Sequence, residues 1–194
     1  MALVDRVKAI LLTPKQEWAV IDTEPASTGS LFKNYAVPLA AIPALAYFIG
    51  LSVIGLRFMG VSVRVPMENT LPGAIVHFLG ALAGAFVLGL VIDALAPTFG
   101  GQKNQIQALK VAVYSSTAAW LAGIFFILPN LAVLSLVGLY SLYLLYLGLP
   151  VLMKVAEDKA LPYTIVVILV GIVISIIVRE VAKSVVGIPG QLGP

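Results

Sequence analysis

The stretch ALKVAVYSSTAAWLAGIFFILPNLAVLSLVGLYSLYLLYLGLPVLM, residues 108–153, decides the fold of this chain. It contains 46 residues, and Lys110 is its only charged residue. As one α-helix it would be about 69 Å long, more than twice the roughly 30 Å hydrocarbon core of a bilayer. Pro129-Asn130, near its middle, is the only strong turn dipeptide in the stretch. We therefore predict a tight, uncharged hairpin between two membrane-spanning helices.

Three further apolar stretches, two before this hairpin and one after it, are each long enough to cross a bilayer. Within all five stretches, only His77, Asp93 and Lys110 carry charge or potential charge. The sequence predicts an all-α integral membrane protein, a bundle of five transmembrane helices. The apolar stretches are residues 35–56, 71–96, 108–128, 131–152 and 161–177, and the last helix is expected to continue to about residue 186.

The composition excludes a soluble domain. Of the 194 residues 60% are hydrophobic and only 11% charged, and the mean hydropathy is +1.05, whereas soluble domains carry about 25% charged residues. No cysteine is present, so disulfides, thiolate metal sites and thiol nucleophiles are excluded. We divide the chain into an amphipathic cytosolic arm at residues 1–34, a five-helix membrane domain at 35–186 and a short extracytoplasmic tail at 187–194.

The arm carries an amphipathic pattern. Leu3, Val7 and Ile10 recur at helical spacing on one arc, and we place Asp5, Arg6 and Lys8 on the other. Such a helix is typical of a segment that lies on a membrane surface. Trp18, in the next predicted helix, is expected to anchor the arm in the lipid headgroup region.

The basic residues predict the orientation. Short cytoplasmic loops are enriched in lysine and arginine, and with a cytoplasmic N-terminus eight of the basic residues lie inside and four outside. We therefore predict the N-terminus in the cytoplasm and the C-terminus outside it. The inner set is Arg6, Lys8, Lys15, Lys33, Lys103, Lys110, Lys154 and Lys159; the outer set is Arg57, Arg64, Arg179 and Lys183. Because the basic residues are scattered, we expect membrane lipids as partners and no nucleic acid.

Three segments resemble the Yip domain family, the Ypt/Rab-interacting multipass membrane proteins, in its bacterial form. They are Pro-Lys-x-Glu-Trp-x-x-Ile at residues 14–21, Phe99-Gly100-Gly101, and the tyrosine-rich pattern of residues 140–148 in the fourth span. The resemblance covers nearly the whole chain and implies five spans and a bacterial inner membrane. In eukaryotic relatives it implies Rab contacts and vesicle traffic, but the arm here lacks their long cytosolic extension and bacteria lack Rab proteins.

Asp93 is the one acidic residue inside an apolar stretch, and ionisable groups at membrane depth are functional candidates because their insertion is costly. It lies near the cytoplasmic end of the second span, where Lys110 opens the third span on the same side. Two interpretations follow. Asp93 and Lys110 form a structural pair or interfacial anchor, or Asp93 serves an ion or partner site.

His77, near the outer end of the second span, is the only histidine. It lies about 24 Å along the helix from Asp93, too far to share a proton or a metal ion. It either hydrogen-bonds to a neighbouring helix or interfacial water, or takes part in a proton step.

Tyr140 and Tyr143 belong to a row of hydroxyls in the fourth span that continues to Tyr146. Buried tyrosine hydroxyls need hydrogen-bond partners. The row either lines a hydrophilic cleft or packs against the small-residue faces of the first and second spans.

No motif for catalysis or for cofactor binding is present: the chain lacks a phosphate-binding loop, a nucleophile elbow, a zinc-binding His-Glu-x-x-His and paired carboxylates in one span. We therefore predict no enzyme activity, no metal and no cofactor. The predicted function is a membrane adaptor or scaffold for proteins or lipids, with other membrane proteins or a second copy as partners. The alternative is a small-solute or ion transporter or channel that uses Asp93.

Overall fold

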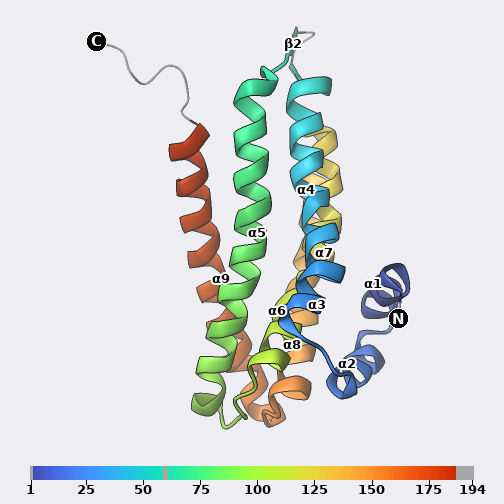
Figure 1. The fold of residues 1–194 in the computed structure, drawn as a ribbon, viewed down its shortest axis with the longest axis vertical. Helices are drawn as coiled ribbons and strands as arrows, with labels where there is room; N and C mark the ends of the chain where they lie inside the picture. Colours follow the sequence, from blue (N-terminus) through green and yellow to red (C-terminus); the bar gives the residue numbers. More distant parts are fainter. Residues whose placement is uncertain (1, 59–60, 187–194) are drawn as a thin grey trace.

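The computed structural model describes the backbone of residues 2–58 and 61–186. In these residues the chain forms an elongated bundle with two short helices attached at its side (Figure 1). Five helical segments are long and apolar enough to cross a membrane, which confirms the predicted five-helix class. These segments are Thr28–Ile54, Met67–Phe99, Gln105–Ile127, Leu131–Met153 and Glu157–Val181. The predicted tail, residues 187–194, lies outside the described residues.

The arm forms two helices, α1 (Leu3–Leu12) and α2 (Pro14–Thr23), separated at Thr13. Pro14 begins α2, where its missing N–H costs no helical hydrogen bond. In Figure 1 both helices lie beside the lower part of the bundle, near α8.

The first span begins at Thr28, earlier than the predicted residue 35. Ser27 and Ser30 form a capping box that starts α3 (Thr28–Leu31), and their reciprocal hydrogen bonds satisfy amides that a helix start leaves free. The span then passes through a π-helical turn, η1 (Phe32–Ala36), into α4 (Val37–Ile49) and ends in a second π turn, η2 (Gly50–Ile54).

A short antiparallel hairpin of β1 (Leu56–Phe58) and β2 (Val61–Val63) connects the first span to the second at the upper end in Figure 1. The second span, α5 (Met67–Leu95), returns to the lower end. A 3-10 turn, η3 (Ala96–Phe99), follows, and Gly100 leaves it in the left-handed conformation (φ 75°) that glycine adopts without strain. The side-chain oxygen of Asn104 then caps the next helix by accepting a hydrogen bond from the backbone N–H of Gln107.

The third and fourth spans form the predicted hairpin. The chain rises through α6 (Gln105–Ser115), α7 (Thr117–Ala122) and a 3-10 turn, η4 (Gly123–Ile127), and it descends through a long 3-10 segment, η5 (Pro129–Leu139), and α8 (Tyr140–Met153). Leu128 joins the two, so the reversal next to Pro129 is confirmed. The break between α6 and α7 falls where the Ser116 hydroxyl donates to the Ala112 carbonyl, 2.7 Å away, and so competes with the helical ladder.

The last span, α9 (Glu157–Val186), packs along α5, which also contacts α4 and α6 and so holds the centre of the bundle (Figure 1). Two glycines allow the first span to approach the third closely. A Cβ on Gly123 would overlap Pro43, and one on Gly50 would overlap the Phe126 carbonyl. The main core extends beyond the bundle, because Ile10, Trp18 and Ile21 of the arm are fully buried within it.

Candidate functional site

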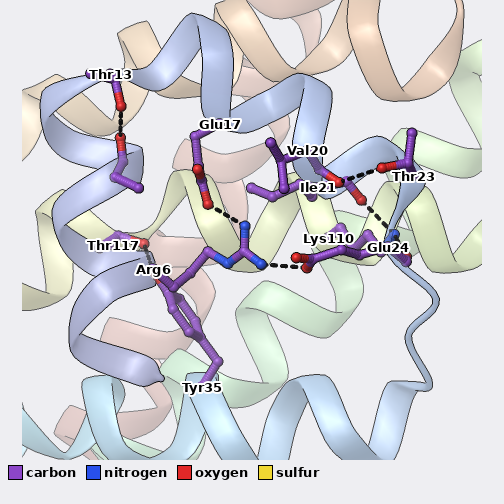
Figure 2. Close-up of polar contacts among 11 residues, drawn as sticks. Arg6, Thr13, Glu17, Val20, Ile21, Thr23, Glu24, Tyr35, Lys110 and Thr117 are labelled. Carbon is purple, nitrogen blue, oxygen red and sulfur yellow. Dashed lines mark hydrogen bonds and ion pairs between the residues drawn. The ribbon is translucent and has the colours of Figure 1, made fainter. Parts of the chain in front are cut away.

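A buried arginine joins the arm to the bundle (Figure 2). Arg6 of α1 is only 4% exposed and forms ion pairs with Glu17 of α2 and with Glu24, the residue that ends α2. Its guanidinium also lies over the ring of Tyr114 in α6, 5.7 Å from the ring centroid. One side chain thus connects both arm helices to the third span.

The charge of Arg6 is balanced by its partners. Burial by itself lowers the pKa of Arg6, but the hydrogen bond to Glu24 and the negative charges of Glu17 and Glu24 outweigh it, so its pKa is raised above the ordinary value. A raised pKa of a cation means that its stabilising contribution is fully present below the unfolded-state pKa. Arg6 therefore stays charged throughout the neutral range.

Lys110 binds the end of α2. Its ammonium group donates to the backbone carbonyls of Ile21, 2.8 Å away, and Glu24, 2.6 Å away. Pro25 stands four residues after Ile21 and has no N–H to offer, so the lysine supplies the donor that the helix end lacks. The cation also lies where the helix dipole favours positive charge.

The predicted pair of Asp93 and Lys110 is therefore wrong, because Lys110 turns toward the arm. Asp93 is partly exposed, and its Oδ1 is buried with no hydrogen-bond partner among the described residues. Its neighbour Ile92 accepts the hydroxyl hydrogen bond of Tyr163 from α9.

The sequence predicts that Trp18 anchors the arm in lipid headgroups. That prediction is wrong, because the protein buries Trp18 completely. Its ring meets the edge of Tyr114, with centroids 6.4 Å apart, and lies against Gly148 of α8. A Cβ at Gly148 would come within 2.7 Å of the indole Cζ2. Because Gly148 has no side chain, it leaves the space that the Trp18 ring occupies.

One tyrosine of the fourth span, Tyr140, contacts the arm. Tyr140 donates its hydroxyl to the Leu11 carbonyl of α1, 3.1 Å away, and Tyr143 stacks at a tilt on Tyr140 with centroids 5.4 Å apart. Tyr143 itself is 42% exposed. Neither interpretation from the sequence, the cleft or the packing on the first two spans, includes the arm contact of Tyr140.

His77 is remote from these groups. Its ring stacks on Tyr47 of α4, with centroids 6.4 Å apart, and it faces a groove along α5. The five predicted polar candidates therefore do not form one site: Lys110, Tyr140 and Tyr143 lie on the side of the arm, while Asp93 and His77 occupy separate levels of α5.

Asp22 joins three segments that are far apart in the sequence. Its carboxylate accepts hydrogen bonds from Lys154 Nζ at 2.6 Å and Gln107 Nε2 at 3.2 Å. Lys154 ends α8 in a left-handed conformation (φ 56°), which is unusual for a residue with a side chain. Nearby, the Gln102 amide donates to the Met153 carbonyl at 2.8 Å. Arm, third span and fourth span are thus held in one arrangement.

Sequence reasoning missed Arg6, Glu17, Asp22 and Glu24, although a signal exists for Arg6. The residue lies three positions after Leu3 and four before Ile10, which places it on the apolar arc and not opposite to it. A charge on that arc needs a buried partner.

Two cavities accompany this arrangement. A polar one of 360 Å³ lies between arm and bundle, beside Arg6, Glu24 and Lys110. A larger groove of 790 Å³ lies between α4, α5 and α9, and Asp93 lines neither cavity. Among the described residues no group of three or more histidine, cysteine or acidic side chains is placed to hold a metal ion.

Comparison with known proteins agrees with the fold. The inner membrane protein YohC of Escherichia coli K12 is 27% identical over 166 residues, which are 83% of this chain and 85% of YohC, and YohC of Escherichia coli O6:H1 gives the same values. No solved structure matches. The Yip1 domain matches residues 8–178. The predicted resemblance is therefore confirmed, and the chain belongs to the Yip1 domain family of multipass membrane proteins.

Proposed function

We propose that the protein is a non-catalytic membrane adaptor that binds a partner protein through the face of the bundle nearest the arm. We call this the arm-side face. It consists of exposed residues from three segments: Lys15, Gln16, Ala19 and Thr23 of α2, residues 102–104 before α6, and residues 156–159 at the start of α9.

The observation that carries this proposal is the bridging by Asp22. Its hydrogen bonds to Lys154 and Gln107 tie α2 to the end of α8 and to the first turn of α6, which adjoin residues 156–159 and 102–104. The face therefore does not need a partner to hold its segments together. A preorganised surface loses less conformational freedom on binding than a loose one, which favours affinity. A chain whose arm only rested on lipid would not need this buried scaffold of ion pairs and backbone contacts.

We place the arm-side face in the cytoplasm of a bacterium, with the chain in the inner membrane. The name of the similar protein YohC describes it as an inner membrane protein, and the basic residues favour the arm side as the inner side.

Because the sequence contains no cysteine, single-cysteine variants test this orientation. In intact spheroplasts a membrane-impermeant maleimide should label Arg64→Cys and spare Lys103→Cys until the membrane is opened. The reverse pattern would place the arm outside.

Site-specific photocrosslinking in cells tests the adaptor. A photoreactive amino acid at Lys15 or at Lys103, both exposed and in different segments, should capture the same protein. The matched control is Leu169, which is 57% exposed on α9 and should capture lipid. Asp22→Ala should reduce capture from both arm-side positions. Lipid adducts alone at all three positions would contradict the proposal.

A transporter or channel is the competing class. The buried Oδ1 of Asp93 without a described partner is the observation that favours it. We prefer the adaptor because Asp93 lines neither cavity. Ion flux in reconstituted liposomes that Asp93→Asn abolishes, and Lys103→Gln leaves intact, would favour transport.

A further inference from the structure

The larger groove follows the line along which α5 and α9 meet, with Tyr47 of α4 as its third wall. Three contacts fix the register of the two antiparallel helices. Gly80 meets Val178, Gly84 lies opposite Ile174, and Gly171 lies opposite Leu88. Its volume of 790 Å³ is within the usual range for ligand sites, about 300–1,000 Å³.

The two ends of this groove differ in polarity. By the register of the helices, His77 and Arg179 stand at the end nearest the β1–β2 hairpin, and Leu88 and Gly171 stand at the other. Two serine hydroxyls line the groove, but each donates to a carbonyl of its own span: Ser175 to Ile172, 2.8 Å away, and Ser116 to Ala112, 2.7 Å away. The deeper part therefore offers little free polarity. The groove is therefore amphipathic along its length.

The depth of the groove in a bilayer follows from α9. Residues 161–178 contain no charge, and as a helix they are about 27 Å long, close to the hydrocarbon thickness. Arg179 thus marks the level where hydrocarbon gives way to headgroups. Gly171 lies eight residues earlier, about 12 Å deeper. The groove runs from headgroup level to the middle of the bilayer, which is the depth of one leaflet.

The positive charge at the headgroup end of the groove, on Arg179, is free to bind an anion. Arg179 is exposed, and it has no hydrogen bond or ion pair among the described residues. Glu180 follows it in the chain but does not line the groove. A guanidinium at this depth binds phosphate oxygens with two parallel hydrogen bonds, and His77, which lines the same groove, offers a further polar contact.

From these observations we propose that the groove binds one anionic phospholipid of the leaflet opposite the arm, with its phosphate at Arg179 and His77 and one acyl chain along Gly80 and Gly84. An amphiphile matches the groove in polarity, depth and charge. This site is separate from the arm-side face, so either proposal can fail alone.

Native mass spectrometry of the full-length protein in mild detergent tests the site. Titration with dioleoylphosphatidylglycerol should show one tightly bound lipid, and dioleoylphosphatidylcholine should bind more weakly. Arg179→Gln should weaken binding of the glycerol lipid about tenfold, as expected for loss of a charge-assisted hydrogen bond. The matched control, Arg64→Gln, changes an exposed arginine outside the groove and should have no effect.

Filling the groove tests the acyl chain. Gly84→Leu should abolish binding of both lipids, whereas Ala83→Leu, at an exposed position outside the groove on the same helix, should not. Inorganic phosphate should not compete; complete competition would reduce the site to one for a free anion and overturn the proposal. A dimer that Gly84→Leu converts to monomer would also overturn it, in favour of a second copy.

A measurement on the unaltered protein keeps the test independent of whether a variant folds. Phosphatidylglycerol with a photoreactive acyl chain, incorporated with the protein into vesicles, should crosslink to α5 and α9 between Gly80 and Leu88 and between Gly171 and Val178. Crosslinks spread evenly over the exposed faces of all five spans would contradict a defined site.

Discussion

Replacing Arg6 with alanine should release the arm from the bundle while the five long helices stay assembled. Arg6 is 4% exposed and Glu17 is 5% exposed, so the variant leaves a carboxylate buried without its cation. Removing one partner of a buried ion pair costs about 3–5 kcal/mol. The arm consists of two short helices, and we expect the cost to appear as local opening of this unit.

Hydrogen–deuterium exchange of the protein in detergent measures this release. In Arg6→Ala the amides of α1 and α2 should exchange much faster, and those of α6 should keep their protection. Lys8→Ala is the matched control, because Lys8 is an exposed cation on the same helix. Equal exchange in the two variants, or loss of protection throughout the bundle, would show that Arg6 does not hold the arm.

The two acidic partners provide a finer comparison. The side chain of Glu17 is 7% exposed and that of Glu24 is 38% exposed. Ion pairs that reach solvent contribute only about 0–1 kcal/mol, since water and salt screen them. Glu17→Gln should therefore release the arm more than Glu24→Gln does, and the opposite order would contradict the burial argument.

The membrane helices and the hairpin at Pro129 were predictable because they depend on quantities that a sequence contains directly. An apolar run has a length, a bilayer has a thickness, and a run of 46 residues must turn at its one strong turn signal. No knowledge of which helix faces which neighbour enters that argument.

The arm interface was not predictable in the same way, because its contacts depend on which faces meet. Charge and proximity to the membrane surface pair Lys110 with Asp93, yet the actual acceptors are the backbone carbonyls of Ile21 and Glu24, which have no side-chain signature. Pro25 was the available sign that the Ile21 carbonyl lacks a helical donor. The prediction that Arg6 lies opposite the apolar arc is wrong, and the spacing of Arg6 from Leu3 and Ile10 already indicates that it lies on that arc.

Trp18 shows how composition alone misleads. A tryptophan in an amphipathic arm beside a membrane suggests an interfacial residue, but Gly148, 130 positions later in the chain, leaves the space that its ring fills. The pairing of a large residue with a distant glycine becomes visible only when the helices are packed together.

Trp18→Ala should therefore release the arm about as strongly as Arg6→Ala. The ring is fully buried, and truncation of a buried tryptophan costs about 3–5 kcal/mol, from lost burial and from the cavity left behind. Gly148→Ala should also loosen the arm, by about 1–3 kcal/mol, because the new Cβ would lie 2.7–2.9 Å from the indole ring and force it outward. Exchange of the α1 and α2 amides measures both effects.

The double variant decides whether this contact is the cause. With Trp18 already removed, the atoms that the Cβ of Gly148→Ala would meet are gone, so the second change should cost almost nothing further and the two effects should fall well short of additive. Gly29→Ala is the control, since a Cβ there meets nothing within 4 Å. Full additivity of the Trp18 and Gly148 changes would mean that the glycine acts on α8 by itself. Non-additivity would show that this ring on this glycine joins the arm to the fourth span.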